Sequence, residues 1–166
     1  MKQFQDSLQL AAGTFPENPV FCVDGALDIE KDTSIDYIHG LEKAVGFDFH
    51  CIKCVKKGLN QWIQTFAEHG AATAAHVLDS LPFAEASDME LTGIFKKAMG
   101  GQALSVEEIA AYKTGLLLHC ARQYAKQNMA MEIYVSCPAC AEGPLAQLRA
   151  KLDEAQPRIT LLSREG

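Results

Sequence analysis

The chain has 166 residues, which is the size of one ordinary domain and is long enough to bury a single core. Apolar residues make up 48% of it and charged residues 22%, so its composition is that of a globular protein rather than a disordered one. The formal net charge of −6 argues against nucleic acid or an anionic membrane as a partner, because neither is attracted by a negative surface.

Membrane and export signals are missing from the sequence. No apolar run approaches the roughly 18 residues of a membrane helix, and residues 1–19 lack the apolar segment of a secretory signal. We therefore expect a cytoplasmic protein with no membrane partner, whose six cysteines are thiols by default.

Strand and helix signals alternate along the chain. An apolar run at 20–23 follows Pro19 and predicts a buried strand, after which Asp24 and Gly25 turn the chain. Two capping boxes, 87–90 and 105–108, each place serine three residues before glutamate and mark the starts of two helices. In chain order the sequence predicts strand 20–23, helix 35–45, helix 48–68, strand 71–81, helix 87–100, helix 105–124, strand 131–135, helix 144–155 and strand 159–162.

This order predicts a parallel α/β sheet with helices outside it, since consecutive strands are separated by helical crossovers. No linker or repeat divides the chain, so residues 1–166 are expected to form one domain. Four strands do not close a (β/α)₈ barrel, which needs eight strands and about 250 residues. The sheet is therefore predicted to be open, or part of something larger.

Two Cys-x-x-Cys pairs occur, Cys51 with Cys54 and Cys137 with Cys140. Together they could hold zinc, but they lie much further apart than the roughly 15–20 residues between the pairs of a zinc ribbon. The second pair follows a predicted strand and precedes a helix, where a redox dithiol is possible. The alternative for both pairs is a set of structural or unpaired thiols.

The five histidines form no His-x-His or His-Glu-x-x-His motif, so no metal site is visible from spacing. His76 differs from the other histidines because it falls within a predicted strand, close to Asp79. A histidine near a carboxylate at a strand end can orient a substrate or exchange protons. The alternative is a histidine buried in the core with its hydrogen bonds satisfied.

Three stretches together resemble one known family. They are "ALDIE…DYIHGLEK", "FAEHGAATAAHVLDSLPFAEASDMEL" and "GQALSVEEIAAYKTGLLLHCARQYAKQNMAMEIYV". From about residue 20 to 135 they resemble an interior part of uronate isomerase (glucuronate isomerase), a divergent metal-dependent barrel of the amidohydrolase type. The resemblance implies a partial (β/α)₈ TIM-barrel-like fold, with parallel strands and outer helices.

The resemblance also implies a reaction in carbohydrate metabolism, the aldose–ketose isomerisation of D-glucuronate to D-fructuronate. A proton moves between C2 and C1 of the hexuronate through an enediol, beside zinc or another divalent metal, while arginines pair with the sugar carboxylate. The family's metal-binding His-x-His motif and its last-strand aspartate have no counterpart in this sequence. We therefore expect no metal in this chain alone.

Carried over by position, the family's site is only partly present. His76 and Asp79 match a HALD-like segment of the family. Cys22 stands where the family has arginine, and Tyr134 stands where it has histidine. The candidate catalytic residues are His76, Asp79 and Tyr134.

The leading interpretation is a uronate-isomerase-like chain that is incomplete and inactive alone. Its expected partners are a hexuronate sugar and either a second copy of the chain or a complementing barrel segment, because a partial barrel leaves strand edges and apolar faces uncovered. Two alternatives stay open: a non-catalytic assembly or binding protein, and a thiol or zinc protein that uses the Cys-x-x-Cys pairs.

Overall fold

The computed structural model describes residues 15, 17–79, 83–136, 143–156 and 158–163. Its sheet has four strands in the order β1-β2-β3-β4, and every neighbouring pair is parallel. The strands are β1 (Val20–Phe21), β2 (Thr73–Leu78), β3 (Ala130–Val135) and β4 (Ile159–Ser163). Because the spatial order equals the chain order, the sheet is a consecutive arc of β/α units, as predicted for a partial barrel.

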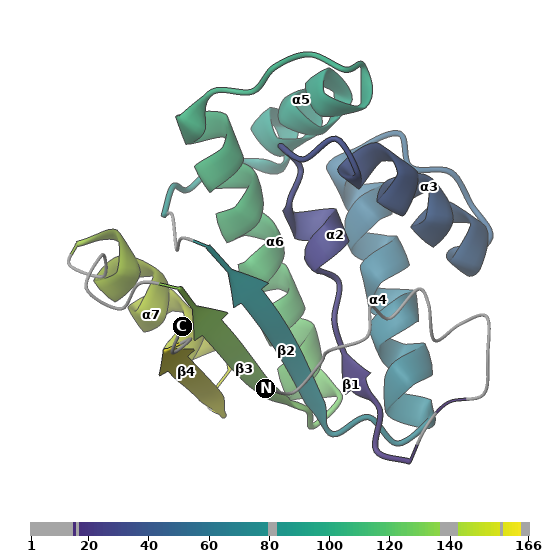
Figure 1. The fold of residues 1–166 in the computed structure, drawn as a ribbon, viewed down its shortest axis with the longest axis vertical. Helices are drawn as coiled ribbons and strands as arrows, with labels where there is room; N and C mark the ends of the chain where they lie inside the picture. Colours follow the sequence, from purple (N-terminus) through teal and green to yellow (C-terminus); the bar gives the residue numbers. More distant parts are fainter. Residues whose placement is uncertain (1–14, 16, 80–82, 137–142, 157, 164–166) are drawn as a thin grey trace.

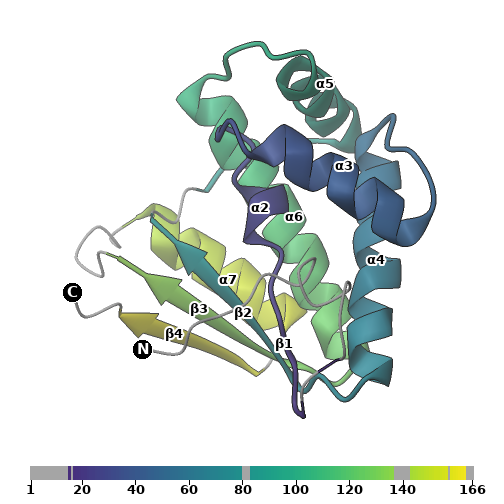
Figure 2. The same ribbon diagram turned by 45° about the vertical axis from the view of Figure 1, so that its right-hand side comes forward.

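Six helices are described: α2 (Asp24–Leu27), α3 (Ser34–Val45), α4 (Ile52–Glu68), α5 (Asp88–Met99), α6 (Val106–Lys126) and α7 (Pro144–Ala155). In Figures 1 and 2 helices α4, α6 and α7 lie on one side of the sheet; α3 packs against α4, and α5 packs against α4 and α6 at one end of the molecule. None of the described helices is long and apolar enough to cross a membrane.

Helix α4 shows why this layer forms. Its apolar residues recur at helical spacing and all are buried against the sheet and the neighbouring helices: Val55, Leu59, Trp62, Ile63 and Phe66. Burial of each such side chain contributes about 1.5–3 kcal/mol. The helix begins at Ile52, four residues later than predicted.

The two faces of the sheet differ. Met131, Ile133 and Val135 of β3 belong to the core beneath the helices, and the alternate residues Glu132 and Tyr134 are half-buried on the opposite face. No described helix covers that opposite face (Figure 2). In a (β/α)₈ barrel the helices cover the outer face of the sheet, and the other face lines the interior. A sheet covered on one face only is therefore what an arc of such a barrel shows.

The predicted helix starts at the two capping boxes are confirmed, and the bounds of two predicted strands are corrected. Both capping boxes form, with Ser87 and Ser105 each accepting from the backbone N–H three residues on. Strand 20–23 is shorter than predicted, because Asp24 opens the unpredicted helix α2. Strand 71–81 extends only over Thr73–Leu78 among the described residues.

Candidate functional site

The carboxyl ends of parallel strands meet at one edge of a sheet, where barrel enzymes place their chemistry. Asp24 comes soon after β1, Asp79 directly follows β2, and Tyr134 lies near the end of β3. These residues make the carboxyl edge of the sheet the candidate site.

His76 lies within a chain of hydrogen bonds that links three elements. Its Nδ1 is 2.7 Å from Asp24 Oδ1, and its Nε2 is 2.8 Å from the hydroxyl of Tyr124 on α6. The second carboxylate oxygen of Asp24 accepts from the backbone N–H of Val77 at 2.9 Å. Asp24 is thus held at both oxygens by β2.

The partners of His76 determine where one of its ring protons lies. The ionised Asp24 oxygen can only accept, so His76 Nδ1 carries a proton and donates it to Asp24. Burial raises the pKa of Tyr124 well above its usual value, so its hydroxyl keeps its proton while it is hydrogen-bonded to Nε2. The imidazole has 0% of its surface exposed and faces the helices, so it touches nothing at the open face.

The structure does not bring His76 and Asp79 together. The side chain of Asp79 is 78% exposed, and its ion-pair partner is Lys31, at 3.9 Å. The carboxylate beside His76 is instead Asp24, which comes from 52 residues earlier in the chain. A catalytic role of either residue stays a prediction.

A charged network borders this edge. Lys113 is almost fully buried and pairs with Asp28 at 3.2 Å and Glu30 at 2.6 Å, while Lys31 pairs with Asp28 at 2.5 Å. The hydrogen bond to Asp28 raises the pKa of Lys31, so the ammonium stays charged. Glu30 and Lys31 also line a cavity of about 410 Å³, together with residues 101–104 of the loop before α6.

Tyr134 lies on the face of the sheet opposite to His76. Its hydroxyl donates to Glu132 Oε2 at 2.9 Å, and partial burial together with this bond raises its pKa. Tyr134 and Glu132 are two residues apart in one strand and therefore share a face. Sequence reasoning missed Glu132, although this spacing could have identified it.

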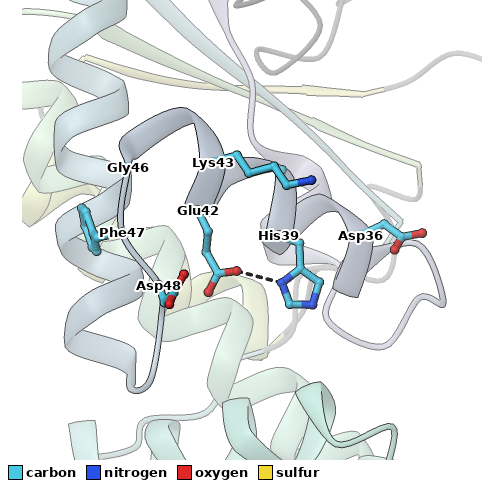
Figure 3. Close-up of a pocket in the computed structure, with 8 residues that line it drawn as sticks. Asp36, His39, Glu42, Lys43, Gly46, Phe47 and Asp48 are labelled. Atoms are coloured by element: carbon cyan, nitrogen blue, oxygen red, sulfur yellow. Dashed lines mark hydrogen bonds and ion pairs between the residues drawn. The ribbon is translucent and has the colours of Figure 1, made fainter.

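A larger cavity, of about 740 Å³, lies along α3 and the loop that follows it (Figure 3). His39 donates to Glu42 Oε2 at 2.7 Å, and the backbone N–H of Phe49 donates to Glu42 Oε1 at 2.6 Å. The bond to Oε2 lies within α3, and the bond to Oε1 holds the helix to the loop that follows it. None of the predicted site residues lines this cavity.

The other histidines and the cysteine pairs are placed as follows. His69 caps α4, and His119 is partly buried with its Nε2 at 2.6 Å from Asn60 Oδ1. Cys51 and Cys54 lie at the start of α4. Cys137 and Cys140 lie outside the described residues, so a zinc site shared by the two pairs stays untested.

The described residues do not fit a divalent metal. Over residues 15, 17–79, 83–136, 143–156 and 158–163, no three histidine, cysteine, aspartate or glutamate side chains come together in a group that could hold one. The carboxyl-edge residues instead form hydrogen bonds and ion pairs with one another.

Comparison with known proteins identifies the family to which this chain is similar. The family model described as glucuronate isomerase matches residues 9–143. A uronate isomerase from Endomicrobium trichonymphae is 32% identical over 119 residues, which is 72% of this chain and 25% of the relative. The chain thus spans about a quarter of the length of the curated relatives that it matches.

Solved structures agree on the fold. The uronate isomerase from Thermotoga maritima matches 87% of this chain with a TM-score of 0.76, and this chain covers 37% of it. The glucuronate isomerase from Caulobacter crescentus matches the same share with a TM-score of 0.69, and 34% of it is covered. Both are 17% identical to this chain. The fold is that of a segment of a TIM-barrel-like isomerase, and the chain belongs to the glucuronate isomerase family.

Proposed function

We propose that this chain supplies one arc of a uronate isomerase barrel and takes part in the conversion of D-glucuronate to D-fructuronate. The observation that carries the proposal is the run of four consecutive parallel strands within the region matched by the family. A cytoplasmic location, expected from the composition, and a place in carbohydrate metabolism belong to the same proposal.

In this proposal His76 is a positioning residue. It is fully buried, so it acts on the sugar only through Asp24, whose side chain is 19% exposed. Asp24 is fixed by His76 on one oxygen and by the Val77 N–H on the other. Because both of its oxygens are already held, this carboxylate needs little rearrangement when a reacting group approaches it.

Lys31 is proposed to pair with the uronate carboxylate. Its side chain is 48% exposed at the carboxyl edge, and the residue lines the 410 Å³ cavity. The resemblance assigns this task to arginine, and Cys22 occupies the corresponding position. Lysine offers a point charge rather than a two-pronged donor, so it holds a carboxylate with less directional control.

Tyr134 and Glu132 are proposed to face the substrate from the open side of the sheet. A protonated phenol next to a carboxylate can donate to a sugar oxygen and return the proton. The enediol step also needs stabilisation of the developing oxyanion, which the described residues do not offer through a metal. In this proposal, other barrel segments supply that stabilisation.

The proposed protein partner is therefore a complementing barrel segment, in the same polypeptide or another. The support is the face of the sheet that no described helix covers, flanked by the edge strands β1 and β4. The same face favours the second candidate function, a non-catalytic assembly protein in which a second copy covers the sheet.

The test is turnover of D-glucuronate to D-fructuronate with zinc added. The purified chain alone is expected to be inactive, and mixing it with the Endomicrobium trichonymphae relative lacking its matched 119 residues should restore turnover. Lys31→Gln should then raise KM more than it lowers kcat. Lys151→Gln is the matched control, since that lysine is 46% exposed and pairs with Glu85 at 3.6 Å.

Turnover by the chain alone would contradict the partial-barrel reasoning. A folded chain that binds the truncated relative without restoring turnover would favour the assembly function. A folded chain that neither binds nor restores activity would remove the uronate isomerase proposal.

A further inference from the structure

The first Cys-x-x-Cys pair forms a dithiol at the start of α4. Cys51 is the residue that precedes the helix, in an extended conformation, and Cys54 lies in the first turn. Their sulfur atoms are 3.3 Å apart, and both residues are partly exposed. A disulfide bond is about 2.0 Å long, so the sulfurs need to approach by only roughly 1.3 Å.

The start of the helix favours a negative charge on Cys51. The backbone N–H of Cys54 is the largest influence that lowers the pKa of the Cys51 thiol, followed by the thiol of Cys54, and Lys53 acts in the same direction. The first helical N–H, that of Ile52, donates to Thr92 Oγ1 of α5 at 3.1 Å. This bond ties the dithiol segment to the neighbouring helix and holds the pair in place.

We propose that Cys51 and Cys54 form a thiol–disulfide exchange site whose co-reactant is a low-molecular-weight disulfide of the glutathione class. The Cys51 thiolate attacks one sulfur of that disulfide and releases one thiol. The Cys54 thiolate then attacks Cys51 Sγ and releases the second thiol. The protein dithiol is oxidised to a disulfide, the co-reactant is reduced to two thiols, and its sulfurs receive the two protons.

The other described cysteines do not compete for this role. Cys22 and Cys120 are buried, and burial raises the pKa of Cys120 to about 12, which keeps its sulfur protonated and unreactive. They serve as internal reference thiols. Cys137 and Cys140 also form a Cys-x-x-Cys pair in the sequence, so the test must remove them.

The experiment uses the full chain carrying Cys137→Ser and Cys140→Ser, incubated with mixtures of oxidised and reduced glutathione. Remaining thiols are then alkylated, and the peptides are identified by mass spectrometry. The expected product is an intramolecular Cys51–Cys54 disulfide that dithiothreitol reverses, while Cys22 and Cys120 are recovered as thiols.

Two further variants assign the order of attack. Cys54→Ser should stop at a mixed disulfide on Cys51, and Cys51→Ser should slow the loss of thiol by about tenfold or more. Circular dichroism of each variant checks that it is folded. Equal rates for the two folded variants, or a folded parent chain that forms no internal disulfide, would overturn the proposal.

Discussion

Replacing Asp24 by alanine removes the acceptor of two hydrogen bonds, those from His76 Nδ1 and from the Val77 N–H. Each buried donor left without an acceptor costs about 1–3 kcal/mol. Asp24 is 19% exposed, so water can partly replace it, and we expect a total loss of about 2–4 kcal/mol. This is a large share of the roughly 5–15 kcal/mol that stabilises a typical domain.

Urea unfolding followed by the fluorescence of Trp62, the single tryptophan, measures this loss. With a urea dependence of about 2 kcal/mol per molar, the midpoint should fall by about 1–2 M. Asp79→Ala is the matched control: its carboxylate is 78% exposed and 3.9 Å from Lys31, so its effect should stay below about 0.5 kcal/mol. If the two variants lose equal stability, the assignment of Asp24 as the partner of His76 is refuted.

The remaining predictions test the packing and the buried titratable groups. A Cβ on Gly58 would lie 2.3 Å from the ring of Phe49, so Gly58→Ala should destabilise by about 1–3 kcal/mol. A Cβ on Gly93 of α5 would meet open space, so Gly93→Ala should raise the free energy of unfolding by up to about 1 kcal/mol. Thermal midpoints of the two variants that shift in the same direction would contradict this pair of predictions. Burial lowers the pKa of His119 from 6.5 to about 4, so the unfolded chain binds the proton first and the free energy of unfolding should fall as the pH drops from 6.5 to 4. Urea titrations at several pH values should show a weaker fall for His119→Gln, and identical pH profiles would rule this out. Burial raises the pKa of Tyr124, so stability should decrease above pH 10, and its phenolate absorbance should appear only with unfolding. Ionisation of all four tyrosines in the folded protein would contradict that burial.

Much of the fold was predictable because its signals are local. The serine–glutamate capping boxes at the starts of α5 and α6 involve residues three apart, and both form. Helix α2 was not predictable in this way, since Asp24 and Gly25 resemble a turn. It forms because Ala26 and Leu27 are buried and because Gly25, lacking a Cβ, lets the ring of Tyr37 approach closely.

The candidate site was only partly predictable, because most of its contacts join residues far apart in the sequence. His76 was correctly placed in a strand, but its partners Asp24 and Tyr124 lie 52 and 48 residues away. A hydrogen bond of that range depends on the packing of helices and strands, which spacing along the chain does not report. Glu132 was missed, although it lies in the same strand as Tyr134 and strand alternation alone would have been sufficient to identify the pair.

The buried His76 has a consequence for how β2 finds its alignment with β3. The strand reads TAAHVL, and its adjacent alanines fit either face, so its apolar pattern specifies the alignment only weakly. In the observed pairing His76 lies beside Ile133 and reaches both Asp24 and Tyr124. A slip of one residue would turn the imidazole to the other face and leave both partners without it. A polar side chain in the core thus selects one strand register where the alanines would accept two.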